Sequence, residues 1–172
     1  MKTLHIFDFD DTLVRSDSGV IVNRADGKTE RMSSSDYKGY VPEEGDELDF
    51  SEFDENLTDP EIVEEVFAEL NAAVALDGPS SVVILTARSN PAPVEHFLSD
   101  NSVAGVTVVA VGSSSPFAKA KYIMNRLKAE DFDEVVVFED NVKNIRTIRK
   151  VFSDTDVKLE TNRVTKFGVY TR

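Results

Sequence analysis

Three short runs of large apolar residues, each followed at once by polar residues, constrain the fold of this chain more than any other feature. The runs are LHIF at 4–7, VVIL at 82–85 and EVVVF at 134–138. Such continuous runs are typical of parallel strands, which are buried because helices cover both faces of their sheet. The sequence therefore predicts an α/β protein with a central parallel sheet and right-handed crossovers.

The spacing of apolar residues predicts the remaining elements. A helix is predicted over 59–76, where Asp59 can cap the helix and Pro60 can occupy its first position. Further helices are predicted at 93–100, 116–130 and 141–152, and further strands at 104–112 and 157–162.

Residues 14–58 interrupt this alternation. Asp26-Gly27 lies between two partly alternating runs, which indicates a tight β-hairpin turn. Residues 43–56 hold eight acids and no base, more than half of the formal net charge of −13. We interpret the acidic stretch as a solvated loop, with repulsion of polyanions as a weaker alternative. We expect a single domain over 1–172, with 14–58 as a small flap or cap.

The composition limits the cellular compartment that we expect for the protein. The chain has no cysteine, and no apolar run approaches the roughly 20 residues needed to cross a bilayer. The first residues also lack the apolar core of a secretory signal. We therefore expect a cytoplasmic protein without membrane contact, and a monomer is favoured.

Polar side chains follow three of the predicted strands, at the edge where parallel sheets form ligand sites. Asp8 and Asp10 are two apart, so they can face one point while Asp11 points elsewhere. If the strand at 134–138 is a neighbour, Asp140 joins them, and clustered carboxylates then require a cation or shifted pKa values. Oxygen ligands with no histidine nearby favour Mg²⁺ over zinc.

Each of these residues alone has a commonplace interpretation. An aspartate after a strand usually caps the next helix, and a threonine such as Thr86 usually caps a turn. Lys119 and Lys121 alone are ordinary helix residues, and Arg88 fits a structural ion pair as well as it fits a phosphate contact. The ordered occurrence of the whole set is what favours a functional site.

That ordered set resembles the haloacid dehalogenase superfamily of phosphotransferases. Its first motif, an apolar strand followed by Asp-x-Asp-x-Thr, matches Asp8, Asp10 and Thr12. Its second, an apolar strand ending in Thr or Ser, matches VVILT and Thr86. The resemblance implies a Rossmann-like three-layer sandwich with a minimal cap.

The third and fourth motifs complete the resemblance. The third, a lysine near a helix start, fits PFAKAKYIMNRL, where the lysine that precedes the apolar stripe is Lys119, although Lys121 stays open. The fourth, a strand followed by acids and an amide, matches VVVFEDNVKN, with Asp140 and Asn144 four apart.

The resemblance implies a phosphatase that uses an aspartyl-phosphate. Asp8 would be the nucleophile and Asp10 the general acid and base, with Mg²⁺ between the Asp8 carboxylate, the Asp10 backbone carbonyl and Asp140. Thr86 and Lys119 would contact the phosphoryl group. Thr12, Arg88 and Asn141 would bind substrate, and Glu139 would support the ligands.

The sequence leaves alternatives open for both the substrate and the class of function. A cover as short as 14–58 leaves an open site, which would admit a small phosphomonoester, a nucleotide or a phosphorylated nucleic-acid end. The other function class is a non-catalytic or receiver-like phospho-acceptor domain for signalling or protein interaction. In a receiver domain the acids precede the threonine and lysine, whereas here Glu139 and Asp140 follow both.

Overall fold

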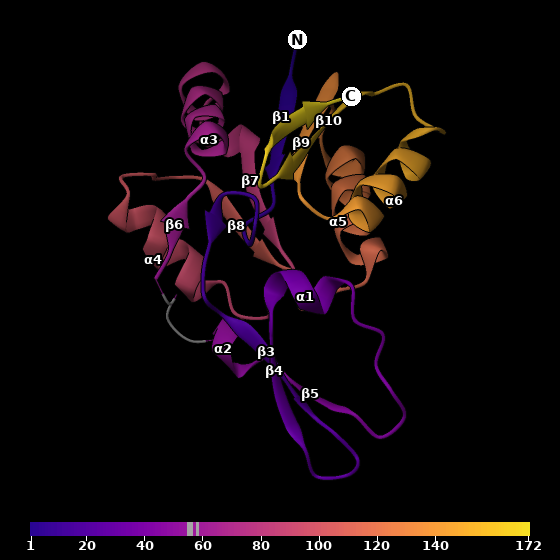
Figure 1. Ribbon diagram of the computed structural model, residues 1–172. Helices are drawn as coiled ribbons and strands as arrows, with labels where there is room; N and C mark the ends of the chain where they lie inside the picture. The colour runs from indigo at the N-terminus through magenta and orange to yellow at the C-terminus, as the bar shows by residue number, and fades with distance from the viewer. Residues whose placement is uncertain (55–56, 58) are drawn as a thin grey trace.

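The central sheet expected from the apolar runs is present and mostly parallel (Figure 1). The structure, a computed structural model, describes residues 1–54, 57 and 59–172. The sheet has the order β11-β10-β9-β1-β7-β8, in which the pair of β10 and β11 is antiparallel and the other pairs are parallel. Its strands are β1 (Thr3–Phe7), β7 (Val82–Thr86), β8 (Thr107–Ala110), β9 (Glu134–Glu139), β10 (Lys158–Thr165) and β11 (Gly168–Thr171).

Helices cover both faces of this sheet, which confirms the predicted α/β arrangement (Figure 1). In β1, alternate side chains enter opposite cores: Leu4 and Ile6 pack toward one pair of helices, and Phe7 packs toward the other. The helices on the Leu4 side are α5 (Pro116–Ala129) and α6 (Val142–Phe152), and those on the Phe7 side are α3 (Glu64–Asp77) and α4 (Ala92–Asp100).

The first core helix begins later than predicted, so the expected start at residues 59–60 is wrong. Glu61–Ile62 form strand β6, which pairs antiparallel with β2 (Val14–Arg15). The N–H of Val63 then donates to the carbonyl of Leu13 at 2.9 Å, and α3 starts at the next residue. Pairing with the distant β2 overrides the local signal of proline at a helix start.

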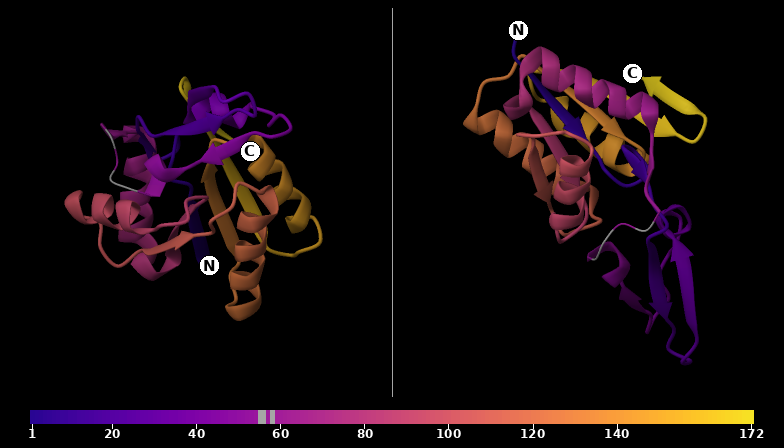
Figure 2. Two further views of the ribbon diagram at one scale, coloured as in Figure 1. Left: turned by 90° about the horizontal axis from the view of Figure 1, so that it is seen from below. Right: turned by 90° about the vertical axis from the view of Figure 1, so that its left-hand side faces the viewer.

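Residues 19–54 form a second, antiparallel sheet, and we call this segment the flap. Its strands have the order β4-β3-β5, and the chain reverses at Gly27, whose φ of 86° suits glycine. The flap comprises β3 (Gly19–Asn23), β4 (Thr29–Ser33), α1 (Ser34–Lys38), β5 (Glu47–Asp49) and α2 (Ser51–Asp54). It lies beyond the carboxyl ends of the central strands (Figure 2). Residues 55, 56 and 58, which belong to the predicted segments 43–56 and 14–58, lie outside the described residues.

A short 3₁₀ helix, η1 (Pro79–Ser81), leads from α3 into β7. None of the helices in the described part of the chain combines the length and apolar character needed to cross a bilayer.

Candidate active site

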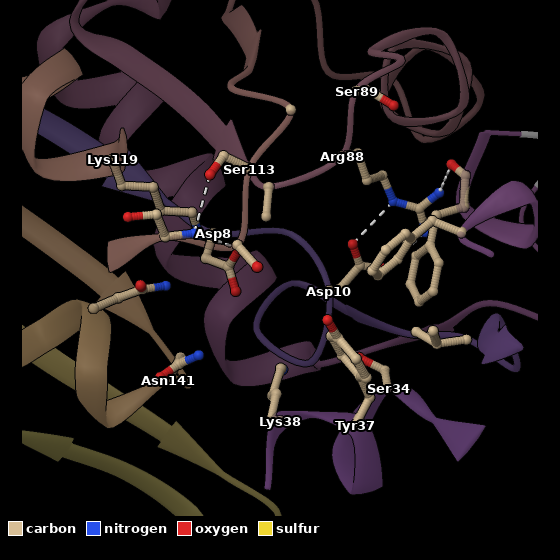
Figure 3. Close-up of a pocket in the computed structure, with 18 of the residues that line it drawn as sticks. Asp8, Asp10, Ser34, Tyr37, Lys38, Arg88, Ser89, Ser113, Lys119 and Asn141 are labelled. Carbon is tan, nitrogen blue, oxygen red and sulfur yellow. Dashed lines mark hydrogen bonds and ion pairs between the residues drawn. The ribbon is translucent and has the colours of Figure 1, made fainter. Parts of the chain in front are cut away.

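The polar residues that follow β1 and β9 meet at the carboxyl edge of the central sheet (Figure 3). These strands are neighbours, and the N–H of Asp8 donates to the carbonyl of Phe138 at 2.9 Å. This register brings Asp8 beside the acids that end β9.

Asp8 is buried, and both of its carboxylate oxygens are held. Its Oδ1 accepts a hydrogen bond from Lys119 Nζ at 2.7 Å, and its Oδ2 accepts one from the Thr12 hydroxyl at 2.8 Å. The same hydroxyl lies 3.3 Å from Asp140 Oδ1. Thr12 is fully buried, so it positions two carboxylates here, whereas the resemblance implied that it binds substrate.

The two lysines that the sequence left open occupy different environments on α5. Lys119 is 4% exposed and its ammonium contacts both Asp8 and Glu139, the latter at 2.8 Å. Lys121, two positions along the helix, is exposed to solvent. The structure therefore brings Lys119 to the acidic cluster and leaves Lys121 outside it.

Glu139 uses its carboxylate to hold the start of α6. Its Oε1 accepts the backbone N–H groups of Asp140 and Asn141, at 3.1 and 3.0 Å. Its Oε2 accepts the Asn144 side-chain amide at 3.1 Å in addition to Lys119. Asn141, expected to bind substrate, caps α6 by accepting the N–H of Lys143 at 2.9 Å, and it also lines the cleft described below.

The carboxylates fit a hard cation. One oxygen from each of Asp8, Glu139 and Asp140 lies within 4.8 Å of the others. These three carboxylates could hold a metal ion, and Asp8 and Asp140 are the two that the resemblance implies as ligands. The Asp10 carboxylate is not in this group, since it pairs with Arg88, which leaves its backbone carbonyl for the metal role that the resemblance implies.

Crowding and burial shift the pKa values in this cluster in opposite directions. Burial, with the nearby charges of Asp8 and Glu139, raises the pKa of Asp140 to about 9. Burial, the largest effect, opposes ionisation of Asp8 too, but Lys119, Asp140 and Lys38 together outweigh it and hold the pKa of Asp8 below its ordinary value. Conversely, burial acts against the Lys119 ammonium, and Asp8 and Glu139 raise its pKa. The site therefore contains an ionised Asp8 beside an ionised Lys119.

Arg88 forms a bidentate ion pair with Asp10 in the lining of the cleft (Figure 3). Its Nε and Nη2 lie 2.9 and 2.8 Å from the two carboxylate oxygens, and its Nη1 donates to the Phe53 carbonyl at 2.6 Å. Arg88 thus has the structural ion pair that the sequence allowed, instead of a free guanidinium for substrate. Burial raises the pKa of Asp10, although the ion pair with Arg88 acts in the opposite direction.

Thr86 ends β7 as predicted, but its polar groups bond to backbone N–H groups. Its side chain is buried, and its hydroxyl accepts the N–H of Arg88 at 3.2 Å. Its carbonyl accepts the N–H of Val111 at 2.9 Å. Thr86 therefore shapes the turn that carries Arg88, and the residues that follow it line the cleft.

Lys38 reaches the acidic cluster from the flap, a contact that the sequence reasoning missed. Its Nζ lies 2.9 Å from Asp11 Oδ2 and forms a second ion pair with Asp140 Oδ2. The Ser34 hydroxyl also donates to Asp11, at 2.9 Å. Asp11 therefore points toward the flap, away from Asp8. The sequence offers one indication of this contact, because Lys38 is the one basic residue between Arg31 and Arg88.

A cleft of about 400 Å³ joins these groups. Its core side includes Asp8, Asp10, Arg88, Lys119 and Asp140. Its flap side includes Val20, Tyr37, Lys38, Phe50 and Phe53. The aromatic residues Phe50 and Phe53 were missed as site residues, because residues 43–56 were interpreted only as a solvated acidic loop.

The chain matches no protein-family model, no curated protein and no solved structure.

Proposed function

We propose that this protein is a Mg²⁺-dependent phosphohydrolase of the haloacid dehalogenase type, cleaving phosphomonoesters through an aspartyl-phosphate on Asp8. One observation carries the proposal: Asp8 lines the cleft as a carboxylate, with Lys119 2.7 Å away, and Asp10 lies in the same cleft. An ionised acid beside a buried ammonium suits attack on an anionic phosphorus centre, because the ammonium reduces the repulsion.

In the first step, an Asp8 oxygen attacks phosphorus and the bond from phosphorus to the ester oxygen breaks. Lys119 neutralises charge on the transferred phosphoryl group. Thr12 keeps the Asp8 carboxylate oriented, since its hydroxyl is fixed at 2.8 Å from Oδ2.

Asp10 acts as a general acid toward the leaving alcohol and as a general base toward the attacking water. It donates a proton to the departing oxygen, and it then accepts one from the water that attacks the aspartyl-phosphate, which releases phosphate and restores Asp8. Its raised pKa favours the protonated form that the first step requires. One Asp10 oxygen must leave Arg88 for this transfer.

Bound between Asp8 and Asp140, Mg²⁺ would neutralise charge on the phosphoryl oxygens. Asp140 supplies a carboxylate oxygen for that site, and Glu139 keeps Asp140 in place through its backbone N–H.

Hydrolysis of p-nitrophenyl phosphate, with and without Mg²⁺, tests the proposal. We expect turnover by the natural sequence, loss of turnover with excess chelator, and no turnover by Asp8→Asn. Asp26→Asn, in the exposed flap turn, is the matched control and should retain full activity. Full activity of Asp8→Asn would contradict the proposal. A stable phosphoryl group on Asp8 without turnover would instead support the receiver-like alternative.

A further inference from the structure

The two sides of the cleft differ in chemistry. The core side presents carboxylates with Arg88 and Lys119, whereas the flap side presents Lys38 and the rings of Tyr37, Phe50 and Phe53. Tyr37 and Lys38 lie close to Asp10 and Asp8 in Figure 3. Tyr37 and Phe50 pack edge to face, with ring centroids 5.4 Å apart and planes at 82°. Phe50 remains 41% exposed although it is a large apolar side chain. An exposed aromatic side chain beside a candidate catalytic cleft is a surface available for a flat ligand group.

The charges at the cleft suit a ligand with one phosphate. Among the described residues that line the cleft, each basic side chain already has a carboxylate partner: Lys38 with Asp11 and Asp140, Arg88 with Asp10, and Lys119 with Asp8 and Glu139. In the proposed reaction Lys119 serves the transferred phosphate, so a second or third phosphate would have to displace a carboxylate from Arg88 or Lys38. The rest of the ligand should be uncharged.

Hydroxyl groups also line the cleft, and Ser113 lies beside Lys119 and Asp8 (Figure 3). The loop before α5 contributes Ser113, Ser114 and Ser115 to the lining. A nucleoside has aromatic faces for Tyr37 and Phe50 and polar edges and hydroxyls for these serines. The cleft of about 400 Å³ also falls within the range of about 300–1,000 Å³ that is usual for small-molecule sites.

We propose that the alcohol portion of the substrate is a nucleoside, so that the cleft accepts a nucleoside monophosphate with its base against Tyr37 and Phe50. This inference rests on the proposed phosphohydrolase function, whose site supplies the phosphate end.

The test compares adenosine 5′-monophosphate with ribose 5-phosphate. Both are esters of the primary 5-hydroxyl of ribose, so the ratio of their kcat/KM values measures the contribution of the base. The natural sequence should prefer the nucleotide by about tenfold or more, the scale of aromatic stacking on a base. Phe50→Leu and Tyr37→Leu should each reduce this ratio several-fold. Phe167→Leu, which changes an 82% exposed ring on another hairpin, should leave both kcat/KM values unchanged.

Three results would overturn the inference: a ratio near one in the natural sequence, equal effects of Phe50→Leu on both esters, or a preference for O-phosphotyrosine over the nucleotide. Calorimetric binding of the same two esters to Asp8→Asn with Mg²⁺ separates this inference from the proposed function. If no phosphomonoester is hydrolysed, the proposed function fails. The nucleoside site would still be supported if Asp8→Asn binds the nucleotide more tightly than ribose 5-phosphate and if adding Phe50→Leu reduces that difference. Equal binding of both esters would reject it.

Discussion

The ammonium of Lys119 lies 2.7 Å from an oxygen of Asp8, although 111 positions separate the two residues in the chain. The contact forms because α5 packs on the sheet with Ala120 and Ile123 in the core, which directs the neighbouring Lys119 toward the end of β1. Both groups are buried, so each depends on the other for its charged state.

Lys119→Met should destabilise the protein as well as inactivate it. Removing the ammonium leaves Asp8 and Glu139 buried without their cation, and breaking a buried ion pair costs about 3–5 kcal/mol of unfolding free energy. The exposed control Lys121→Met should change stability by less than about 0.5 kcal/mol. Urea unfolding of the two variants measures the difference, and equal stabilities would show that Lys119 is not held in the described ion pairs.

Asp140→Asn should weaken Mg²⁺ binding by at least about tenfold, because losing even an outer partner of a metal site costs about 10–100-fold. Calorimetric titration with MgCl₂ gives the dissociation constants. Asp100→Asn, at the exposed end of α4, is the control and should bind as the natural sequence does. If the two variants bind Mg²⁺ equally well, Asp140 does not ligate the ion.

Lys38→Met should have the opposite effect on the same titration. Lys38 places a positive charge on Asp11 and Asp140, so removing that charge should tighten Mg²⁺ binding several-fold. Lys28→Met removes an equal charge from the exposed flap turn and should leave the affinity unchanged. Unchanged or weaker binding by Lys38→Met would mean that its ammonium does not act on the cation site.

Asp10→Asn should slow hydrolysis by about 10² to 10⁴, the usual contribution of a positioned proton donor. Phosphate should still bind, because the nucleophile and Lys119 are unchanged. Steady-state rates on p-nitrophenyl phosphate and calorimetric binding of inorganic phosphate separate the two effects. An undiminished rate would remove Asp10 from the proton transfers.

The sequence predicts the central sheet well because burial on both faces leaves a strong signal in continuous runs such as residues 82–85. It also places Asp8 and Asp140 at one edge, since parallel strands end together. The start of α3 was predicted wrongly because Ile62 and Val63 continue the helical spacing of apolar residues. In the structure Ile62 belongs to β6, and the N–H of Val63 donates to the carbonyl of Leu13. Local pattern does not specify which distant strand a segment will pair with.

The partners of the site residues were harder to predict than the residues themselves. The isolation of Lys38 among acidic and neutral residues sets it apart in the sequence, but it does not specify that its side chain reaches Asp140 from the flap. Similarly, the position of Arg88 after Thr86 left a substrate contact and an ion pair equally plausible, and the pairing with Asp10 depends on how the loop after β1 folds. Such contacts depend on tertiary packing between segments far apart in sequence.

Identification of a phosphorylated residue tests the central claim most directly. The protein is mixed with Mg²⁺ and a rapidly hydrolysed phosphomonoester, quenched in acid during turnover, digested, and its peptides are examined by mass spectrometry. We predict one added phosphoryl group on Asp8, absent from the Asp8→Asn protein and from samples treated with chelator. A phosphoryl group on another residue, or sustained turnover by Asp8→Asn, would contradict the account.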